Sequence, residues 1–425
     1  MKIVIIGLGY IGLPTALMFA KHGADVVGVD VSRRVVDFLN AGQVPIEEYG
    51  LAEYLTDALA KQKFKASLTA ETGDVFIIAV PTPNVEDEFG SCDLTYVKQA
   101  MESILPHLKS GNTIIVESTI SPRVTEDIIQ PLIQKEGFVT GEDIFLAHCP
   151  ERVLPGKILH ELVYNNRIIG GVTEKCTEKV KEIYGLFVQG KLLSATASVA
   201  ELSKLMENTY RDTNIALANE LVQIGDELGI DALSVIELAN QHPRVDIHQP
   251  GPGVGGHCLA VDPHFIIAEA PNEARLIRQA RQINRNMPNF IFQKTLTIME
   301  ENNGKTITVL GLAYKGNIDD TRESPALQIV NQLQTLTAYD IRTFDPYVAS
   351  SDTYSLESAL LGSDLALVLT DHDAFKAMPD NIIHGMRTPI LFDTKNCISR
   401  KNAFEQHFTL GHLPTDKKRS KSFIN

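Results

Sequence analysis

Long hydrophobic runs are missing from this sequence. No apolar stretch approaches the roughly 20 residues of a membrane-spanning helix, so we expect no membrane partner. The first apolar run, Ile3–Ile6, meets a glycine at position 7, which leaves no room for the apolar region and cleavage site of a signal peptide. We therefore expect a protein without a leader.

Cysteine and net positive charge are also scarce. The five cysteines are odd in number and none has a neighbour at metal-site spacing, which favours a reducing cytoplasm and no metal. The formal net charge of −14 argues against nucleic acid and anionic membranes as partners. An anionic substrate would need basic side chains concentrated locally. The cysteines are Cys92, Cys149, Cys176, Cys258 and Cys397.

What the sequence does have is a repeated α/β pattern. A chain of 425 residues is too long for one hydrophobic core. In its first part, short β-branched apolar runs alternate with helical patterns, which predicts a doubly wound parallel sheet over residues 1–190. The predicted strands are Ile3–Ile6, Val26–Val29, Val75–Val80, Thr113–Val116 and Ile144–Ala147.

The pattern then changes twice. Helices are predicted over 200–228, 233–240 and 272–301, the last kinked or divided at Pro288. These form a central helical domain, residues 191–300, with a surface for a homodimer. Strands at 307–310, 341–344, 365–369 and 390–392, with Ser324 and Pro325 starting a helix, predict a smaller α/β domain over 301–413. We thus expect two Rossmann-like domains joined by a long helical segment, followed by a disordered basic tail, residues 414–425.

A dinucleotide fingerprint, Gly7–Gly12, follows the first predicted strand and opens a helix. Its first glycine allows the tight turn, its second the close approach of a pyrophosphate, and its third the packing of helix on strand. Asp30 ends the next strand, where a carboxylate accepts hydrogen bonds from a ribose diol and repels a 2′-phosphate. The spacing predicts NAD rather than NADP, although Arg33 and Arg34 lie close enough to oppose that choice. The last domain lacks the full fingerprint and by itself predicts no dinucleotide.

Two polar segments end predicted parallel strands, where ligands of open α/β sheets bind. They are Val80–Pro83 and Glu117–Thr119. Each also fits an ordinary turn, in which Ser and Thr bond loop backbone and Pro ends the strand.

Cys258 lies in a glycine-rich loop, residues 251–262, with Asp262 four positions further on. Glycine loses more conformational entropy on folding than any other residue, so a cluster of glycines indicates a required geometry. Here it would let backbone and a bulky ligand approach the sulfur. A thiolate is a strong nucleophile, and a nearby carboxylate can move protons for it. The alternative is an inert, buried cysteine in a turn.

Cations and amides recur at helical spacing. Lys204, Asn208 and Arg211 stand at i, i+4 and i+7, on one face of the long predicted helix, where they could bind an oxyanion. A solvated helix face is the alternative, but a mid-helix asparagine has poor helix propensity and often has a polar role.

Further polar residues accompany these motifs. Glu151, after the fifth strand, is a candidate base. Further donors for an anionic ligand are His242, Arg244, Lys315 and Arg322.

In order and content these motifs resemble the UDP-glucose/GDP-mannose dehydrogenase family over nearly the whole chain. Residues 150–156, 242–245 and 255–262 are most similar to the UDP-N-acetyl-D-mannosamine dehydrogenases of that family. The matching blocks are Gly7–Gly12, Val80–Pro83, Glu117–Thr119, Pro150–Glu151, Ala200–Asn208, Gly251–Asp262 and Lys315–Pro325.

The resemblance implies a role for each matching residue. Cys258 would be the covalent nucleophile and Lys204 the oxyanion stabiliser or proton donor and acceptor. Proton transfer and water activation would involve Asn208, Asp262, Thr119 and Glu151. NAD contacts fall at Gly7, Gly9, Tyr10, Ile11, Gly12, Asp30, Thr82, Thr119 and Arg322. Nucleotide-sugar contacts fall at Arg152, Val153, Lys204, Asn208, Arg211, His242, Arg244, Gly255, Tyr314 and Lys315.

The implied reaction is a four-electron oxidation of the C6 alcohol of UDP-N-acetyl-D-mannosamine, through a thiohemiacetal and a thioester on Cys258, with two NAD per turnover. The product would be a precursor of a surface polysaccharide. Two departures from the family bear on the substrate: Pro155 replaces a glutamate found in the glucose enzymes, and His264 stands where an aromatic residue is common. UDP-N-acetyl-D-glucosamine, an NAD-dependent epimerase and a silent nucleotide-sugar sensor remain the alternatives.

Overall fold

The computed structural model describes residues 1–46, 48–154, 156–349 and 355–414. Contacts divide the chain into two compact units. The first comprises Met1–Glu207 and His264–Pro271, and the second comprises Asn208–Pro263 and the chain from Asn272 onward. Pro155 and residues 415–425 of the basic tail lie outside the described residues.

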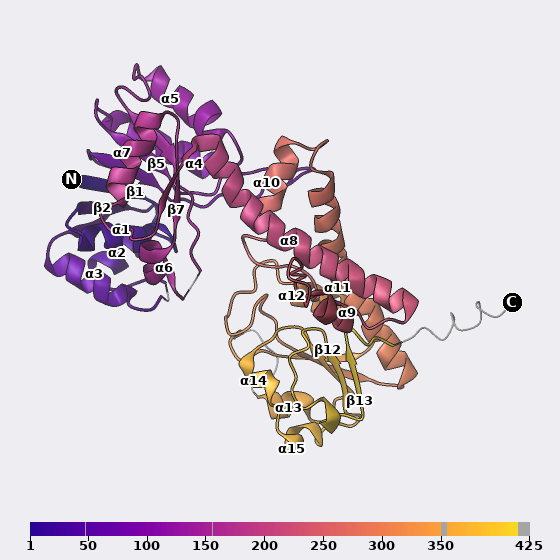
Figure 1. Cartoon of the computed structure of the whole chain (residues 1–425). Coiled ribbons are helices and arrows are strands. Elements are labelled where there is room, and N and C mark those ends of the chain that lie inside the picture. Colours follow the sequence, from indigo (N-terminus) through magenta and orange to yellow (C-terminus); the bar gives the residue numbers. More distant parts are fainter. Residues whose placement is uncertain (47, 155, 350–354, 415–425) are drawn as a thin grey trace. The chain divides into compact units, whose positions relative to one another are not determined.

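The first unit is built on an eight-stranded sheet of order β3-β2-β1-β4-β5-β6-β7-β8 (Figure 1). Neighbouring strands are parallel except β6 and β7, which are antiparallel. The five predicted strands are present, and β3, β7 and β8 are additional. The strands are β1 (Lys2–Ile6), β2 (Asp25–Val29), β3 (Phe64–Ser67), β4 (Val75–Ile78), β5 (Thr113–Val116), β6 (Phe145–His148), β7 (Arg167–Gly171) and β8 (Leu192–Thr196).

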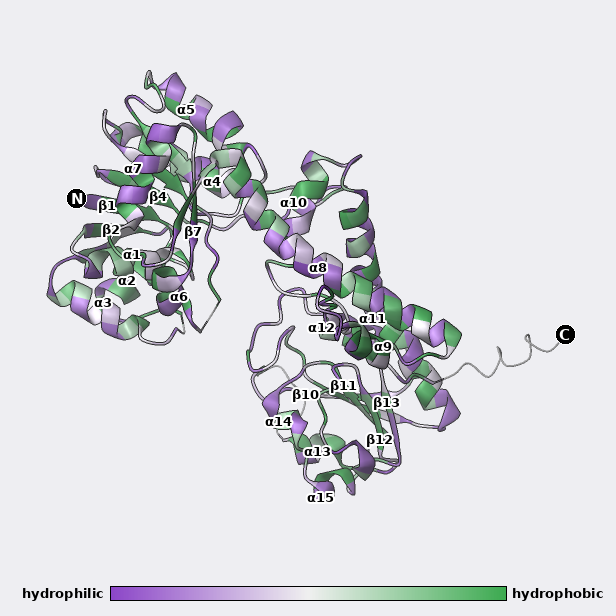
Figure 2. Cartoon of the chain, viewed as in Figure 1, coloured by the Kyte–Doolittle hydropathy of each residue, from purple (hydrophilic) through white to green (hydrophobic). Residues whose placement is uncertain are grey.

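Helices cover both faces of this sheet, so the central strands are apolar throughout (Figure 2). Every residue of β4 and β5 is buried, which accounts for their continuous apolar sequences. One face packs against α1 and α7, and the other against α4. The helices are α1 (Gly12–Lys21), α2 (Arg33–Asn40), α3 (Leu51–Ala60), α4 (Thr95–Ile104), α5 (Gln130–Lys135), α6 (Ile158–Tyr164) and α7 (Glu174–Tyr184).

Two helices contribute residues to both units. The 32-residue helix α8 (Ala197–Leu228) passes from the first unit to the second between Glu207 and Asn208. Helix α10 (Asp262–Glu269) passes between them after Pro263. Helices α9 (Ala232–Ala239) and α11 (Arg275–Glu301) belong to the second unit, and α11 continues through Pro288 without the predicted division.

The second unit contains a five-stranded, all-parallel sheet of order β10-β9-β11-β12-β13. Pro325 starts α12 as predicted, but the Ser324 hydroxyl donates to the Leu312 carbonyl at 2.7 Å instead of capping the helix. The strands are β9 (Thr306–Leu310), β10 (Asp340–Phe344), β11 (Leu365–Val368), β12 (Ile390–Asp393) and β13 (Gln406–Thr409). The helices are α12 (Pro325–Leu336), α13 (Leu356–Leu360), α14 (Asp373–Lys376) and α15 (Asp380–Ile383).

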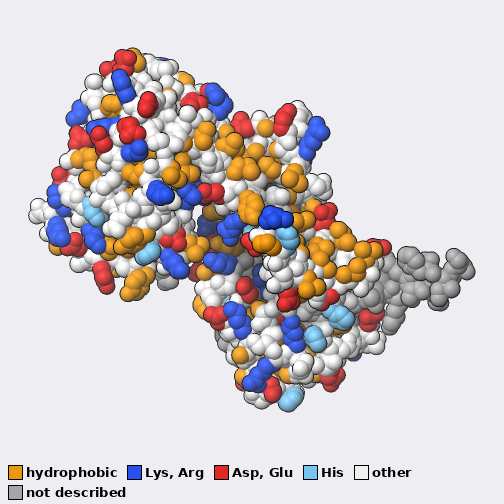
Figure 3. All heavy atoms as spheres, in the orientation of Figure 1, with side chains coloured by type: hydrophobic (Ala, Val, Ile, Leu, Met, Phe, Trp, Pro, Cys, Tyr) orange, Lys and Arg blue, Asp and Glu red, His pale blue; other side chains and the backbone are white. Residues whose placement is uncertain are grey.

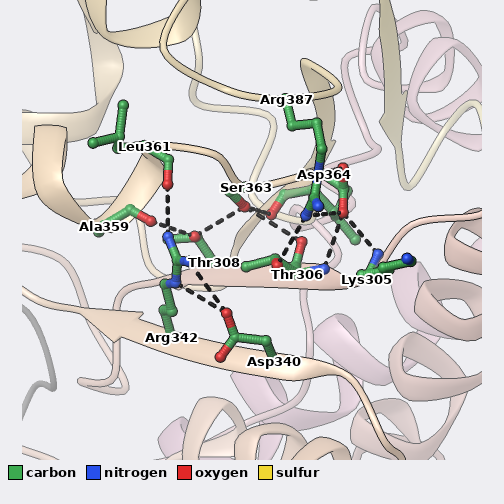
Figure 4. Close-up of polar contacts among 11 residues, drawn as sticks. Lys305, Thr306, Thr308, Asp340, Arg342, Ala359, Leu361, Ser363, Asp364 and Arg387 are labelled. Carbon is green, nitrogen blue, oxygen red and sulfur yellow. Dashed lines mark hydrogen bonds and ion pairs between the residues drawn. The ribbon is translucent and has the colours of Figure 1, made fainter.

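The amino ends of β9 and β11 are joined by a polar cluster (Figure 4). Asp364 accepts the backbone N–H of Lys305 at 2.7 Å and of Thr306 at 3.0 Å, and it pairs with Arg387 at 2.8 Å. The Thr308 hydroxyl donates to Ser363 at 3.0 Å. This cluster joins the start of the two strands and lies at the sheet edge opposite the carboxyl ends.

The two sheets share one local signature. Gly7 follows β1 with φ +96°, and Gly311 follows β9 with φ +94°. Asp30, after β2, accepts the N–H of Leu8 at 3.0 Å. Asp345, after β10, accepts the N–H of Leu312 at 2.7 Å. In both domains a carboxylate from the neighbouring strand therefore fastens the turn after the first glycine.

No helix among the described residues is long and apolar enough to cross a membrane. Within the same residues, no group of three or more His, Cys, Asp or Glu side chains could hold a metal ion.

Candidate functional site

Two of the three fingerprint glycines of the first unit stand where the surrounding backbone leaves no room for a side chain. A Cβ on Gly7 would lie 2.5 Å from the Ala79 carbonyl oxygen, and one on Gly12 would overlap the Gly7 carbonyl. A Cβ on Gly9, by contrast, would meet nothing within 4 Å. The loop is therefore tight on the protein side and open at its second glycine, as close approach of a pyrophosphate requires.

The start of α1 is available to a ligand. Ile11 precedes the helix and provides no side-chain cap, while Tyr10 is 49% exposed. Asp30 accepts the N–H of Leu8 at 3.0 Å on one oxygen and that of Ser32 at 2.8 Å on the other. Because a carboxylate has about four acceptor positions, Asp30 retains capacity for a ribose diol. These features fit a dinucleotide.

The two predicted strand-end segments bond to each other. The Thr82 hydroxyl donates to the Thr119 carbonyl at 2.6 Å, and the Ser118 hydroxyl donates to the Val80 carbonyl at 2.7 Å. Both segments thus serve the turn chemistry that was the alternative prediction. They also form one wall at the carboxyl ends of β4 and β5, beside the fingerprint loop.

Glu117, which ends β5, lies in a buried charged cluster. Arg167, at the start of β7, donates to it at 2.5 Å, and the Tyr184 hydroxyl donates to the same oxygen at 2.5 Å. Thr15 of α1 donates to the other oxygen at 3.3 Å. The Arg167 guanidinium also contacts the Cys149 sulfur at 3.1 Å. Burial raises the pKa of the Cys149 thiol to about 11, although Arg167 opposes it, so this sulfur stays protonated.

Glu151 is buried two residues beyond Cys149, and its carboxylate accepts the N–H of Val153 at 2.5 Å. Burial raises its pKa to about 7, with Arg167 opposing and Glu117 reinforcing the shift. Such a carboxyl exchanges protons near neutral pH, as a general base needs. Arg152 points to Glu207, at 2.8 Å, and to the Asn166 carbonyl.

The predicted site residues on α8 belong to different units, Lys204 to the first and Asn208 and Arg211 to the second. Lys204 is half-buried in the first, where burial and the Lys204 charge lower the pKa of His148 to about 3. Asn208 is buried in the second, and its amide donates to Asp262 at 2.6 Å. Arg211, predicted on the same face, is exposed. The Asn208–Asp262 contact joins α8 to the first residue of α10.

The exposed Cys258 lies in a turn directly before α10. Its carbonyl accepts the N–H of Val261 at 3.1 Å and of Asp262 at 2.9 Å. None of the five cysteines, all of which are described, forms a disulfide. The turn places the thiol outward and ties its backbone to Asp262.

The glycines before Cys258 are required by the segment 314–325. A Cβ on Gly255 would lie 2.6 Å from the Glu323 carbonyl oxygen, and one on Gly256 would lie 2.7 Å from the Tyr314 ring. The Gly256 N–H donates to the Arg322 carbonyl at 3.0 Å. Lys315 and Arg322 are exposed here, and the Arg322 guanidinium pairs with Asp320 at 2.7 Å. Predicted substrate residues from two distant segments thus pack together in the second unit.

Three asparagines that the sequence analysis did not single out hold the segment entering this loop. Asn240 bonds the backbone N–H and carbonyl of Ile247 at 2.8 and 2.9 Å. Asn214 accepts the N–H of His248 at 2.9 Å, and Asn219 accepts that of Gly251 at 2.9 Å. The same segment begins with His242 and Arg244, which are exposed and whose side chains lie 3.4 Å apart.

His264 belongs to the first unit. Its Nδ1 lies 2.7 Å from the Phe89 carbonyl. Because that oxygen only accepts, Nδ1 carries a proton. The ring also packs on Gly90, 3.3 Å from where a Cβ would lie. The residue after Asp262 and Pro263 is thereby fixed to the loop that follows Thr82.

Comparison with known proteins extends these observations to the whole chain. Residues 1–188 match the NAD binding domain of the UDP-glucose/GDP-mannose dehydrogenase family, 198–286 its central domain, and 308–400 its UDP binding domain. The chain belongs to this family.

Individual relatives agree with the assignment. The chain is similar to a UDP-N-acetyl-D-mannosamine dehydrogenase of Methanococcus maripaludis, 48% identical over 93% of each chain. A structure of the UDP-N-acetyl-mannosamine dehydrogenase from Staphylococcus aureus has a TM-score of 0.91 and 52% identity, over 97% of this chain and 99% of that one. One from Pyrococcus horikoshii has the same TM-score and 42% identity, with the same coverage. The protein is an NAD-dependent nucleotide-sugar dehydrogenase.

Proposed function

We propose that this dehydrogenase oxidises the C6 alcohol of UDP-N-acetyl-D-mannosamine to the carboxylate, consuming two NAD⁺ per sugar. The observation that carries the proposal is the exposed Cys258, whose turn is bonded to Asp262 and, through it, to Asn208. A simple alcohol dehydrogenase needs no thiol. A thiol makes an aldehyde oxidisable and keeps it on the enzyme.

Bound NAD⁺ supplies the hydride acceptor for both oxidations. Its pyrophosphate would lie over Gly9 and the start of α1, since the second glycine is open and the helix end has no side-chain cap. Asp30 would hold the ribose diol. The other contacts that we propose are with Gly7, Tyr10, Ile11, Gly12, Thr82, Thr119 and Arg322.

The residues around the thiol would then carry the covalent steps. The Cys258 thiolate adds to the aldehyde carbon, and the carbonyl oxygen becomes the hydroxyl of a thiohemiacetal. Loss of the carbon-bound hydride and of the hydroxyl proton gives a thioester. Water attacks it, and the carbon–sulfur bond breaks to return the thiolate and release a carboxylate. Lys204 would stabilise the developing oxyanion, with Asn208 and Asp262 assisting proton transfer.

Glu151 and Thr119 would position and activate the attacking water. The pKa of Glu151, raised to about 7 chiefly by burial, lets this carboxyl take the proton of water near neutral pH. Thr119 follows the carboxyl end of β5, the strand that pairs with β6. Its backbone carbonyl accepts the Thr82 hydroxyl.

The sugar assignment rests on the similarity to the mannosamine enzymes. We propose that the forked donors of Arg244 and the imidazole of His242 contact the nucleotide sugar above the Cys258 loop. UDP-N-acetyl-D-glucosamine is the alternative substrate, because the two sugars differ in one stereocentre. The remaining proposed contacts are Arg152, Val153, Lys204, Asn208, Arg211, Gly255, Tyr314 and Lys315.

A homodimer through α8 completes the proposal. Large apolar side chains along α8 are exposed at intervals of three, four or seven residues, and Figure 3 shows hydrophobic side chains along its course. Such a stripe is typical of a helix that packs on a partner. It is formed by Val199, Leu202, Met206, Tyr210, Leu217, Ile224 and Leu228. We further propose a cytoplasmic role in supplying a surface polysaccharide precursor, and functional domains with boundaries at 190, 300 and 413.

Product stoichiometry tests this function. With excess NAD⁺, each UDP-N-acetylmannosamine should yield two NADH and one acidic sugar. One NADH with a released aldehyde would contradict the thioester route. No net NADH would favour an epimerase or a silent sensor. Faster oxidation of UDP-N-acetylglucosamine in a panel of UDP-sugars would overturn the sugar assignment alone.

A further inference from the structure

Arg167 is the centre of a buried charge network beneath the proposed water-activating residue. It is 5% exposed, and Glu117 is 2% exposed. The guanidinium contacts Glu117, at 2.5 Å, and Cys149, at 3.1 Å, and it lies over the Tyr184 ring at 4.1 Å from the ring centroid. An isolated buried charge is very costly, and pairing with hydrogen bonds repays much of that cost. Burial raises the pKa of Glu117, and the charge of Arg167 together with the Tyr184 and Thr15 hydrogen bonds opposes that shift and favours the carboxylate as the partner of this cation.

Arg167 and Glu151 line the same small cavity at the carboxyl end of β6. Cys149 directly follows β6 and lies two residues before Glu151. Arg167 contacts the sulfur of this cysteine. Glu117 is paired with this arginine directly, and Glu151 lines the same cavity as the arginine. The charge of Glu117 offsets part of the positive charge that Glu151 would otherwise meet.

We propose that the Glu117–Arg167 pair is a positioning element that controls when Glu151 can accept the proton of the attacking water. Burial leaves Glu151 protonatable near neutral pH, and the charge of Glu117 limits how far Arg167 shifts it toward the ionised form. This proposal rests on the role of Glu151 proposed above. It assigns to Glu117, at a strand end that also fits an ordinary turn, a function in the hydrolysis step.

The other charged groups near Glu151 do not replace the Glu117–Arg167 pair in setting when Glu151 ionises. Lys204 on α8 favours the ionised form, and the charges of Arg167 and Glu117 oppose each other. Arg152 and Glu161 line the same cavity. Arg152 is paired with Glu207, and Glu161 accepts the backbone N–H of Leu154 at 2.8 Å. Arg167 and Glu117 are therefore the pair whose balance a substitution can change.

The test measures thioester hydrolysis directly. Enzyme in excess is mixed with UDP-N-acetylmannosamine and saturating NAD⁺ between pH 5 and 9, then quenched with acid. Intact-mass spectrometry follows the decay of the acyl adduct on Cys258. In the unmodified enzyme the decay rate should rise with pH as Glu151 ionises. Glu117→Gln removes the charge that opposes Arg167, so the midpoint of that rise should move down by about one pH unit.

Glu161→Gln is the matched control, because it removes a carboxylate from the same cavity without touching Arg167. Its midpoint should stay with that of the unmodified enzyme. An unchanged or raised midpoint in folded Glu117→Gln would overturn the proposal, as would an equal shift in Glu161→Gln.

A double variant keeps the proposal testable if Glu117→Gln does not fold. Glu117→Gln combined with Arg167→Met leaves no unpaired buried charge, and its midpoint should lie at or above that of the unmodified enzyme. A midpoint below it would contradict the balance described here. Glu151→Gln separates this inference from the proposed function. If adduct decay keeps its pH dependence in that variant, the role of Glu151 fails. If the dependence disappears there but Glu117→Gln has no effect, only the positioning role fails.

Discussion

Gly256→Ala is the substitution whose effect the structure defines most fully. Gly256 has φ +83°, and an added Cβ would lie 2.7 Å from Cε2 and 2.8 Å from Cζ of Tyr314. The left-handed backbone alone costs an alanine roughly 1–2 kcal/mol, and forcing a methyl into an occupied space costs about 1–3 kcal/mol more. The free energy of unfolding should therefore fall by about 2–5 kcal/mol.

Gly229→Ala provides the matched control. Gly229 has φ +68° at the end of α8, and an added Cβ there would meet nothing within 4 Å. This variant should lose only the backbone part, roughly 1–2 kcal/mol. Urea unfolding of the two variants, followed by circular dichroism, measures the difference. If Gly256→Ala is no less stable than Gly229→Ala, the close packing of the cysteine loop on Tyr314 is wrong.

The same variant should also impair catalysis, because the displaced loop carries Cys258 two residues away. Misplacement of a reacting group by about 1 Å can cost roughly 100-fold in rate. We expect kcat to fall by at least tenfold in Gly256→Ala and to stay unchanged in Gly229→Ala. Equal kcat values would mean that the Tyr314 ring moves aside without disturbing the thiol.

Two further substitutions address the thiol and the cofactor. Cys258→Ser should abolish complete turnover and trap an ester, since an alkoxide leaves less readily than a thiolate, whereas Cys149→Ser should retain activity; the reverse result, seen by NADH yield and intact mass, would make Cys149 the nucleophile. Asp30→Ala should raise the KM for NAD⁺ by removing the acceptor for the ribose diol, and equal kcat/KM with NADP in the unmodified enzyme would show that Arg33 or Arg34 determines cofactor choice.

The central strands could be predicted from sequence because burial on both faces makes them apolar without interruption. Three of the missed strands lack that burial, whereas β7, which was also missed, is largely buried. Strand β8 is mostly exposed or half-buried, and β3 and β13 are edge strands with alternating or polar sequences. Pro288 was expected to kink or divide α11, but the helix is not divided there, and Met287, Pro288 and Ile291 are all buried. Tertiary packing there outweighs the local cost of proline.

The candidate site was predictable where its residues form local motifs. The fingerprint, the Cys258 loop and the Asn208 position could all be found from spacing, and the structure brings Asn208 to Asp262. The Glu117–Arg167–Tyr184 cluster could not, because its members come from β5, β7 and α7 with no common spacing. One signal was present: Arg167 directly precedes the apolar pair Ile168-Ile169, which indicates a buried charge that needs a partner. The roles of the site residues and the domain boundaries stay predictions.

Asp30 and Asp345, which fasten the first glycine turn of their sheets, differ in how many further hydrogen bonds they can accept. Asp345 accepts five hydrogen bonds, from the backbone of Leu312, Ala313, Tyr347 and Val348 and from the His372 ring. Since a carboxylate has about four acceptor positions, Asp345 has none left for a ribose, whereas Asp30 does.

Among the described residues, then, one of the two Rossmann-like sheets can receive a dinucleotide in this way. An enzyme with one such site must retain its half-oxidised sugar through a change of cofactor. The proposed covalent tether to Cys258 would bridge that interval without a second binding site.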